Sequence, residues 1–152
     1  GQRVQVQVPK GVLNGSKLRL KDKGNYQPGT GLRGDLYLKI TVQSHSVWRL
    51  EGKDIYAELP VTYEELVLGS KVRLVIPDGQ AELVIPPGTS LERVFRLKEK
   101  GWPSSRGRGD LFFSLSLKIP SELAQEQLDL LREMHSSRTF DPRSTWLDSA
   151  RL

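Results

Sequence analysis

The chain repeats one short stretch: LRLKDKG at Leu18–Gly24 returns as FRLKEKG at Phe95–Gly101, 77 residues later. The match extends outward in both directions. The flanking matches are Val8–Gly11 with Ile85–Gly88 at the same offset, and Gly34–Tyr37 with Gly109–Phe112 at an offset of 75. Three blocks in one order are difficult to obtain by chance, and such a repeat indicates one structural unit built twice.

Apolar and polar residues alternate along most of both copies. The alternating runs are residues 3–8, 17–20, 35–42, 54–59, 71–76, 81–85, 94–97 and 111–119. One buried and one solvated face is typical of strands in antiparallel sheets. Pro77-Asp78-Gly79, between two of these runs, predicts a tight hairpin. We therefore expect a mainly all-β fold of two tandem related β-sandwich-like domains.

Two segments have a helical pattern. Thr62–Glu65 is a capping box, which predicts a short helix that ends at Gly69. A second helix is expected after Pro120, with Ser121 as its N-cap, running to about His135. Its apolar arc spans about 160° at about 100° per residue. The arc comprises Leu123, Ala124, Leu128, Leu130, Leu131 and Met134. An arc this wide could contact both its own domain and a second chain; a cap over the last strand is the alternative.

The repeat also predicts the domain boundaries. Residues 53–80 supply strands, a helix and a hairpin before the second copy, and no counterpart precedes the first copy after Gly1. We therefore expect the first domain, residues 1–43, to be truncated at its N-terminus. The expected order continues with a connecting segment at 44–52, the second domain at 53–120, a helix at 121–136 and a tail at 137–152.

Composition excludes several classes of protein. The 152 residues include no cysteine, so the chain has no disulfide, thiolate nucleophile or cysteine zinc site. The two histidines, His45 and His135, have no metal-ligand partner at a suitable spacing. No catalytic grouping is present, and no apolar run approaches the roughly 20 residues that span a bilayer. We expect a cytoplasmic, non-enzymatic protein without metal, cofactor or membrane partner.

Three further features bear on binding. Residues 1–43 hold eight basic and two acidic residues, whereas the whole chain has a net charge of +5. This imbalance indicates an acidic partner or a solvated strand surface. Trp48, between the copies, is a candidate ligand contact or a core plug. Arg108-Gly109-Asp110 is an adhesion-like triplet, but we expect Asp110, like Asp35, to cap turn N–H groups.

The motifs together resemble a known family. Val6–Gly11, Gly15–Leu20 and Gly34–Tyr37 resemble the first C-terminal domain of DnaJ-type J-domain co-chaperones. His45–Ile55 resembles the family segment His-Pro-x-Phe-x-Arg-x-Gly-x-Asp-Leu, with Ser46 in place of the proline and Trp48 in place of the phenylalanine. Phe140–Trp146 is similar to the ending of CbpA-like members. The His-Pro-Asp tripeptide of a J domain and the cysteine-rich zinc module are absent.

The resemblance implies the substrate-binding and dimerising half of a zinc-free co-chaperone. Unfolded or extended client polypeptide would bind by strand addition with apolar pockets, at Trp48, Leu18 and Leu20. Lys10, Lys17 and Lys21 would meet the acidic tail of a DnaK-type chaperone. The C-terminus would form a homodimer through Leu123, Leu128, Leu131, Met134, Phe140 and Trp146. The alternative is DNA binding, because CbpA-like relatives are associated with curved DNA and the first quarter is basic.

Overall fold

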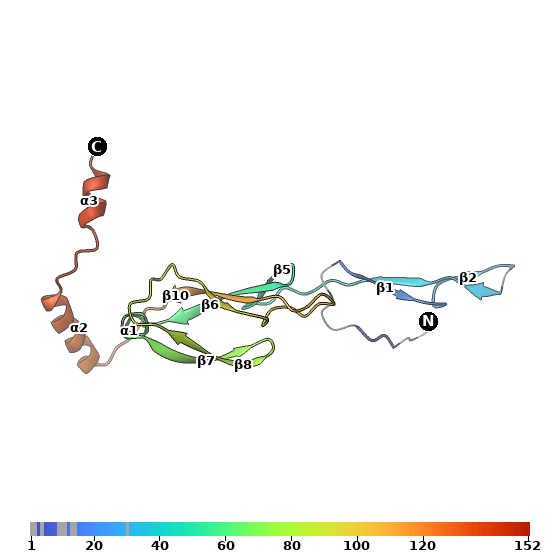
Figure 1. The fold of residues 1–152 in the computed structure, drawn as a ribbon, viewed down its shortest axis with the longest axis horizontal. Helices are drawn as coiled ribbons and strands as arrows, with labels where there is room; N and C mark the ends of the chain where they lie inside the picture. The colour runs from blue at the N-terminus through green and yellow to red at the C-terminus, as the bar shows by residue number, and fades with distance from the viewer. Residues whose placement is uncertain (1–2, 4, 9–11, 13–14, 30) are drawn as a thin grey trace. The chain divides into compact units, whose positions relative to one another are not determined.

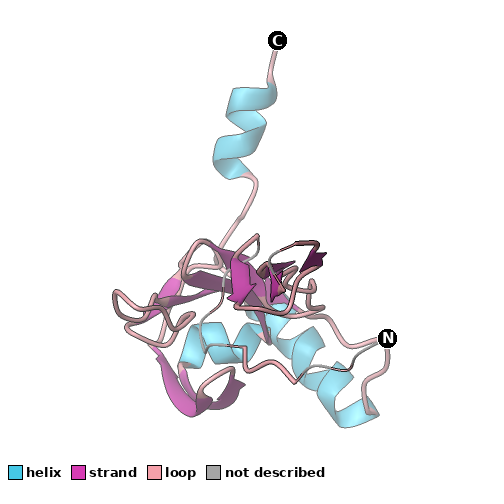
Figure 2. Cartoon of the chain, turned by 90° about the vertical axis from the view of Figure 1, so that its right-hand side faces the viewer, coloured by secondary structure: helices cyan, strands magenta, loops and turns pink. Residues whose placement is uncertain are grey.

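The computed structural model describes residues 3, 5–8, 12, 15–29 and 31–152. The chain divides into two compact units, residues 1–118 and residues 119–152. Strands, coloured magenta in Figure 2, make up most of the regular structure of the first unit, and only helices occur in the second. The predicted mainly β fold followed by a C-terminal helix is confirmed.

The first copy of the repeat forms two small antiparallel sheets. β1 (Lys17–Leu20) pairs with β4 (Leu36–Lys39), and β2 (Tyr26–Gln27) pairs with β3 (Leu32–Arg33). In the β1–β4 register, Leu18 lies opposite Leu38 and Leu20 lies opposite Leu36. Directly opposite residues share a face of a sheet, so β1 and β4 have one apolar face and one basic face.

The second copy is built on a four-stranded mixed sheet. Its order is β5 (Arg49–Glu51), β6 (Asp54–Val61), β10 (Leu111–Leu117) and β9 (Phe95–Leu97). β6 and β10 are parallel, with Leu111 opposite Ile55, and the other pairs are antiparallel. The expectation of antiparallel pairing is therefore wrong for the central pair. A long connection between β6 and β10 allows the chain to return in the same direction, which a tight hairpin cannot do.

A hairpin of β7 (Ser70–Ile76) and β8 (Gly79–Ile85) forms a second layer beside β6 and β10 (Figure 1). Helix α1 (Tyr63–Leu68) follows β6, and its predicted capping box is confirmed: the Thr62 N–H donates to Glu65 Oε1 at 2.9 Å. Both layers contribute to one core, whose buried residues are Ile55, Ala57, Leu59, Val61, Leu66, Ile76, Leu83, Ile85, Phe95, Leu111 and Phe113. The second copy therefore has the layered architecture expected of it.

Some strand expectations fail. Residues 3 and 5–8 alternate but lie in no strand, and Val4 is outside the described residues. Alternation sets only which side chains share a face, whereas a strand also needs a neighbour for its backbone hydrogen bonds. Conversely, β2, β3 and β5 were not predicted, because two or three residues are too few for a periodic signal.

The second unit contains α2 (Gln125–Ser137) and α3 (Ser144–Ala150). The prediction that Ser121 caps the first of these helices is wrong, because residues 121–124 are not helical. Ala124 is extended, and its N–H donates to Gln127 Oε1 at 3.2 Å, so the first turn begins at Gln125. Leu123 and Ala124 therefore precede the helix. α3 was predicted only as tail, because seven residues carry too little periodicity.

Candidate functional site

The repeated stretch forms the same corner in both copies. In the first copy, Asp35 accepts a hydrogen bond from Arg19 Nε at 2.6 Å and another from the Asp22 N–H at 3.1 Å. Asp22 has φ of 58°, in the left-handed region. The carboxylate thus holds a tight turn that follows β1.

The second copy repeats these contacts. Asp110 accepts hydrogen bonds from Arg96 Nε at 2.7 Å and from the Glu99 N–H at 2.9 Å, and Glu99 has φ of 59°. The predicted capping role of Asp35 and Asp110 is confirmed. The basic and acidic residues of the repeated stretch are therefore partly structural.

The adhesion-like triplet is engaged in the same corner. Arg108 Nη1 pairs with Asp78 Oδ1 at 2.7 Å, and Arg108 Nε donates to the Gly101 carbonyl at 2.9 Å. The Asp110 carboxylate is occupied by Arg96. Both charged side chains of the triplet thus support the fold, as the sequence predicted for Asp110.

These corners predict acid sensitivity. The backbone N–H of Asp22 and then Arg19 lower the pKa of Asp35, and Glu99 and Arg96 do the same for the pKa of Asp110. A carboxyl whose pKa is lowered by folding adds stability above its unfolded pKa and loses this contribution as pH falls through the folded pKa. We expect the free energy of unfolding to fall below about pH 4.

The double variant Asp35→Asn, Asp110→Asn cannot titrate at these positions, so its stability should fall less steeply from about pH 4 to 2. Denaturant unfolding at stepped pH measures the slope. Asp148→Asn is the control, because Asp148 has no ion pair among the described residues. A double variant with an unchanged slope would contradict the assignment.

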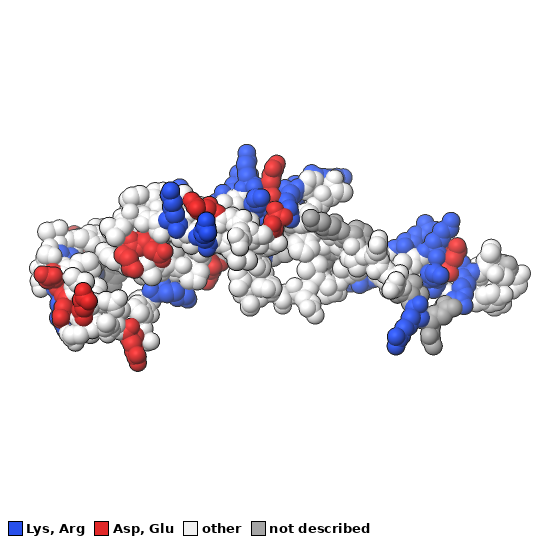
Figure 3. All heavy atoms as spheres, turned by 90° about the horizontal axis from the view of Figure 1, so that it is seen from below, with Lys and Arg blue, Asp and Glu red and all other residues white. Residues whose placement is uncertain are grey.

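A basic face lies on β1 and β4. Lys17 lies directly opposite Lys39, and both are exposed with no ion-pair partner in the described part of the chain. Tyr37, 61% exposed, joins them around a hollow of about 360 Å³. Figure 3 shows Lys and Arg side chains gathered over this region of the strands. Two like charges directly opposite each other are destabilising, and an anionic ligand would relieve this repulsion.

The predicted basic residues are only partly placed there. Lys21 follows β1 and is the next exposed residue after Arg19, whereas Lys10 lies outside the described residues. Lys39 was missed by sequence reasoning. The alternation of residues 35–42 placed it on the polar face, but only the strand register puts it opposite Lys17.

The apolar face of the same sheet is incompletely covered. Leu18, Leu20 and Leu38 are half-buried, and Leu36 is 36% exposed. In the described residues β4 pairs only with β1, whereas its repeat counterpart β10 has a strand on each side. One edge of β4, next to an apolar face, thus has no strand partner among the described residues.

Trp48 lies outside the sheet of β1 and β4 that contains Leu18 and Leu20. Its ring packs edge-on against Phe113, with centroids 5.9 Å apart, and it contacts the core of the second copy. It also lines a hollow of about 560 Å³ in residues 42–52. His45 shapes this segment, because its Nδ1 accepts the N–H groups of Val47 at 3.0 Å and Trp48 at 3.4 Å. The structure does not bring the three predicted substrate contacts together.

The predicted dimerisation residues are on the surface of the second unit. Leu123 and Leu128 are half-buried, and Leu131, Met134, Phe140 and Trp146 are exposed. No residue of α2 or α3 is buried. Their apolar side chains are available to a partner.

Among the described residues no three metal-ligating side chains are grouped as an ion site requires. None of the helices described combines the length and apolarity needed to cross a membrane. The fold itself defines the class of protein: a tandem of two related, mainly β units, each with the same Asp–Arg corner, followed by helices.

Comparison with known proteins gives the family. The family model described as the DnaJ C terminal domain matches residues 1–120, so the chain belongs to the DnaJ C-terminal domain family. The resemblance derived from the motifs is confirmed.

Relatives named as DnaJ chaperones and as curved DNA-binding proteins match most of the chain. Chaperone protein DnaJ 2 of Synechocystis sp. is 35% identical over 149 residues, covering 97% of this chain and 47% of that protein. Chaperone protein DnaJ of Clostridioides difficile is 38% identical over 132 residues, covering 86% and 34%. A curved DNA-binding protein of Coxiella burnetii is 36% identical over 146 residues, covering 96% and 46%. The chain thus spans half or less of the length of these curated relatives.

Proposed function

We propose that this chain is the client-binding part of a non-enzymatic, cytoplasmic co-chaperone. It binds unfolded or extended polypeptide, supports delivery to a DnaK-type chaperone and dimerises through its C-terminus. The domain boundaries at about residues 43, 52 and 120 belong to the same proposal. Family membership supports the general role. The apolar and basic faces of β1 and β4 support separate binding sites for the client and for the chaperone tail.

The two-faced sheet is the observation that carries the proposal. Its apolar side, with Leu18 and Leu20, adjoins the edge of β4 that has no partner strand in the part of the chain that the structure describes. An extended peptide can add to such an edge through main-chain hydrogen bonds while its apolar side chains meet the apolar face. The opposite side offers Lys17 and Lys39 to an acidic tail. Client and chaperone tail would thus bind opposite faces of one small sheet.

Single substitutions on adjacent residues separate the two activities. Leu18→Ser should weaken binding of an extended apolar peptide by at least about tenfold, since burying a leucine contributes about 1.5–3 kcal/mol. Lys17→Glu should weaken binding of an acidic peptide by roughly 2–5-fold, as expected for an exposed ion pair. Fluorescence anisotropy with both labelled peptides measures all four combinations.

Each variant is the control for the other, because Leu18 and Lys17 are neighbours on opposite faces. The proposal requires each substitution to affect one peptide and spare the other. Equal losses for both peptides would indicate unfolding of β1, which circular dichroism would detect. Apolar-peptide binding unchanged in a folded Leu18→Ser variant would refute the assignment of this face.

DNA binding is the second candidate, favoured by the basic face and by the similarity to a curved DNA-binding protein. DNA affinity should fall steeply with salt, because bound phosphates release counterions. Apolar-peptide affinity should barely change over the same range. Lys39→Glu should weaken DNA binding and reduce the salt slope by about one for each phosphate that is no longer bound.

A further inference from the structure

We propose that Trp102 is a latch between the two copies of the repeat. Its indole N–H donates to the Val12 carbonyl at 3.1 Å, although the two residues lie 90 positions apart in the sequence. Val12 precedes β1 in the first copy, whereas Trp102 lies between β9 and β10 of the second. The bond fixes the orientation of the sheet of β1 and β4 relative to the second copy. This role goes beyond the proposed function, because it is conformational and needs no ligand.

The repeat shows that the corner at Trp102 forms without a tryptophan. Asn25 holds the corresponding position of the first copy, 77 residues earlier, and it is exposed. The main chain makes the same hydrogen bond in both copies. The Gly34 N–H donates to the Asn25 carbonyl at 3.0 Å, and the Gly109 N–H donates to the Trp102 carbonyl at 3.1 Å. The role of the indole therefore lies in what the side chain itself contacts.

The indole is firmly attached to the second copy. Trp102 is half-buried and packs against the hydrophobic core, and its backbone N–H donates to the Lys53 carbonyl at 2.8 Å. The preceding carbonyl, of Gly101, accepts Arg108 Nε at 2.9 Å. A tryptophan Nε1–H can only donate, and it usually finds an acceptor when it is buried. The Val12 carbonyl is that acceptor, so a rigid part of the second copy holds the first.

The covalent connection between the copies has the properties of a hinge. Residues 40–48 lie in no helix or strand. The connection ends at Trp48, whose ring packs edge-on against Phe113 of the second copy. A few residues without regular structure can absorb the backbone rotation of a hinge. Through this connection alone, the sheet of β1 and β4 would be free to turn.

The Trp102 bond adds a second attachment, on the other strand of that sheet. The connection continues β4, whereas Val12 precedes β1. The two strands are joined next to these points. The Gly15 N–H donates to the Ile40 carbonyl and the Ile40 N–H donates to the Ser16 carbonyl, both at 2.7 Å. A sheet held through both strands does not turn on one of them, so breaking the Trp102 bond leaves only the hinge.

The absence of cysteine makes a distance measurement direct. Spin labels at Lys23→Cys in the first copy and Glu82→Cys in the second occupy exposed positions. An excess of unlabelled chain limits the measured distances to those within one chain. Pulsed electron paramagnetic resonance should give one narrow distance distribution. Trp102→Phe keeps a ring but has no N–H to donate, so the ratio of open to latched chains should rise roughly fivefold and the distribution should widen.

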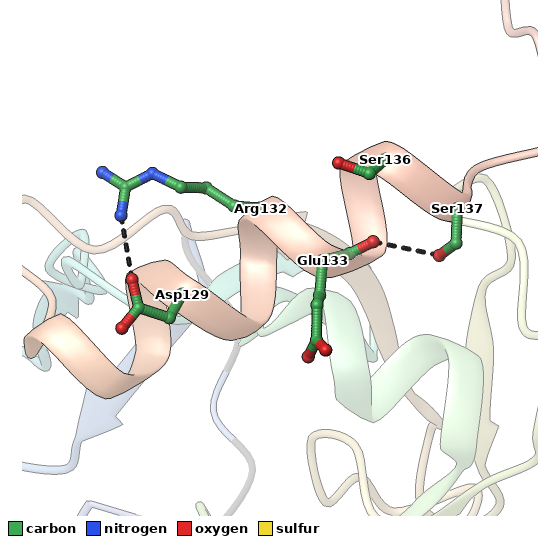
Figure 4. A pocket seen from close by; sticks show the side chains of 5 residues that line it. All are labelled: Asp129, Arg132, Glu133, Ser136 and Ser137. Carbon is green, nitrogen blue, oxygen red and sulfur yellow. Dashed lines mark hydrogen bonds and ion pairs between the residues drawn. The ribbon is translucent and has the colours of Figure 1, made fainter.

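Trp102→Asn places the first-copy residue at this position and removes the ring as well, so it should widen the distribution further. An unchanged distribution in both folded variants would overturn the latch. The control pair is Glu82→Cys with Ser136→Cys on α2, where Figure 4 marks no interaction of the Ser136 side chain. Trp102→Phe should leave this pair unchanged. Equal widening of both pairs would also overturn the proposal, because the substitution would then loosen the second copy as a whole.

Exchange of the indole N–H groups with deuterium, followed by nuclear magnetic resonance, tests the bond itself. The indole N–H of Trp102 should exchange at least roughly fivefold more slowly than that of Trp146, the factor expected for one net hydrogen bond. Trp146 is the reference because it is 61% exposed. Equal exchange rates would show that the bond to Val12 does not persist in solution, and the latch would be refuted.

Discussion

Gly109→Ala is expected to destabilise the second copy strongly. A Cβ at residue 109 would overlap the Lys53 carbonyl group and lie 2.9 Å from Asp54 Oδ1. The backbone has no freedom to withdraw, because the Asp110 N–H donates to Asp54 Oδ1 at 2.8 Å and the Asp110 carbonyl accepts the Ile55 N–H at 2.9 Å. Overpacking typically costs about 1–3 kcal/mol and occasionally more, and we expect an overlap with main-chain atoms to reach the upper end of this range. Thermal unfolding followed by circular dichroism should show a midpoint lowered by roughly 6–12 °C.

The repeat supplies the matched control, Gly34→Ala. Gly34 occupies the same position in the first copy, yet the nearest atom to a Cβ there would be Gln27 Nε2 at 3.7 Å. We expect a change within about 0.5 kcal/mol, as for an ordinary surface substitution. Similar losses for the two variants would mean that the approach to Lys53 is not the cause. A tolerated Gly109→Ala would show that residue 109 does not approach Lys53 and Asp54 as closely as described.

The corner in each copy could be predicted from the sequence because its hydrogen bonds join residues of the repeated blocks themselves. Arg96, Glu99 and Asp110 lie within one corner, and the matching residues of the first copy form the same hydrogen bonds. The pairing of the strands could not be predicted in the same way. β6 and β10 are far apart in sequence, and their parallel pairing depends on the packing of the whole layer rather than on either strand's alternation.

The candidate site was partly predictable for the same reason. Lys17 and Leu18 were assigned to opposite faces by alternation alone, which the burial pattern of β1 matches. Lys39 required the register, and the position of Trp48 against Phe113 required the tertiary fold. The start of α2 was missed because its N-cap is Ala124, an apolar residue, whose N–H donates to the Gln127 side chain. Sequence reasoning favoured Ser121, since serine is a preferred N-cap residue and alanine is not.

Leu111→Ala should cause a comparably large loss of stability without steric overlap. Leu111 is fully buried, at 0% exposure, and lies between Ile55 of β6 and Leu97 of β9. Removing a buried leucine side chain costs about 2–5 kcal/mol, the transfer free energy plus the cost of the cavity. Denaturant unfolding at neutral pH should show a lower midpoint with an unchanged slope, because the surface exposed on unfolding hardly changes.

Leu36→Ala is the corresponding change in the first copy, where Leu36 is 36% exposed and only β1 lies beside its strand in the described residues. Since less apolar area is removed from water and no closed cavity forms, we expect a loss below about 1 kcal/mol. The two leucines occupy one position of the repeat, so the difference measures the packing that surrounds each copy. A larger loss at Leu36 than at Leu111 would contradict a core centred on the second copy. It would instead indicate that the apolar face of β1 and β4 is covered in solution, in which case Leu18→Ser should be strongly destabilising as well.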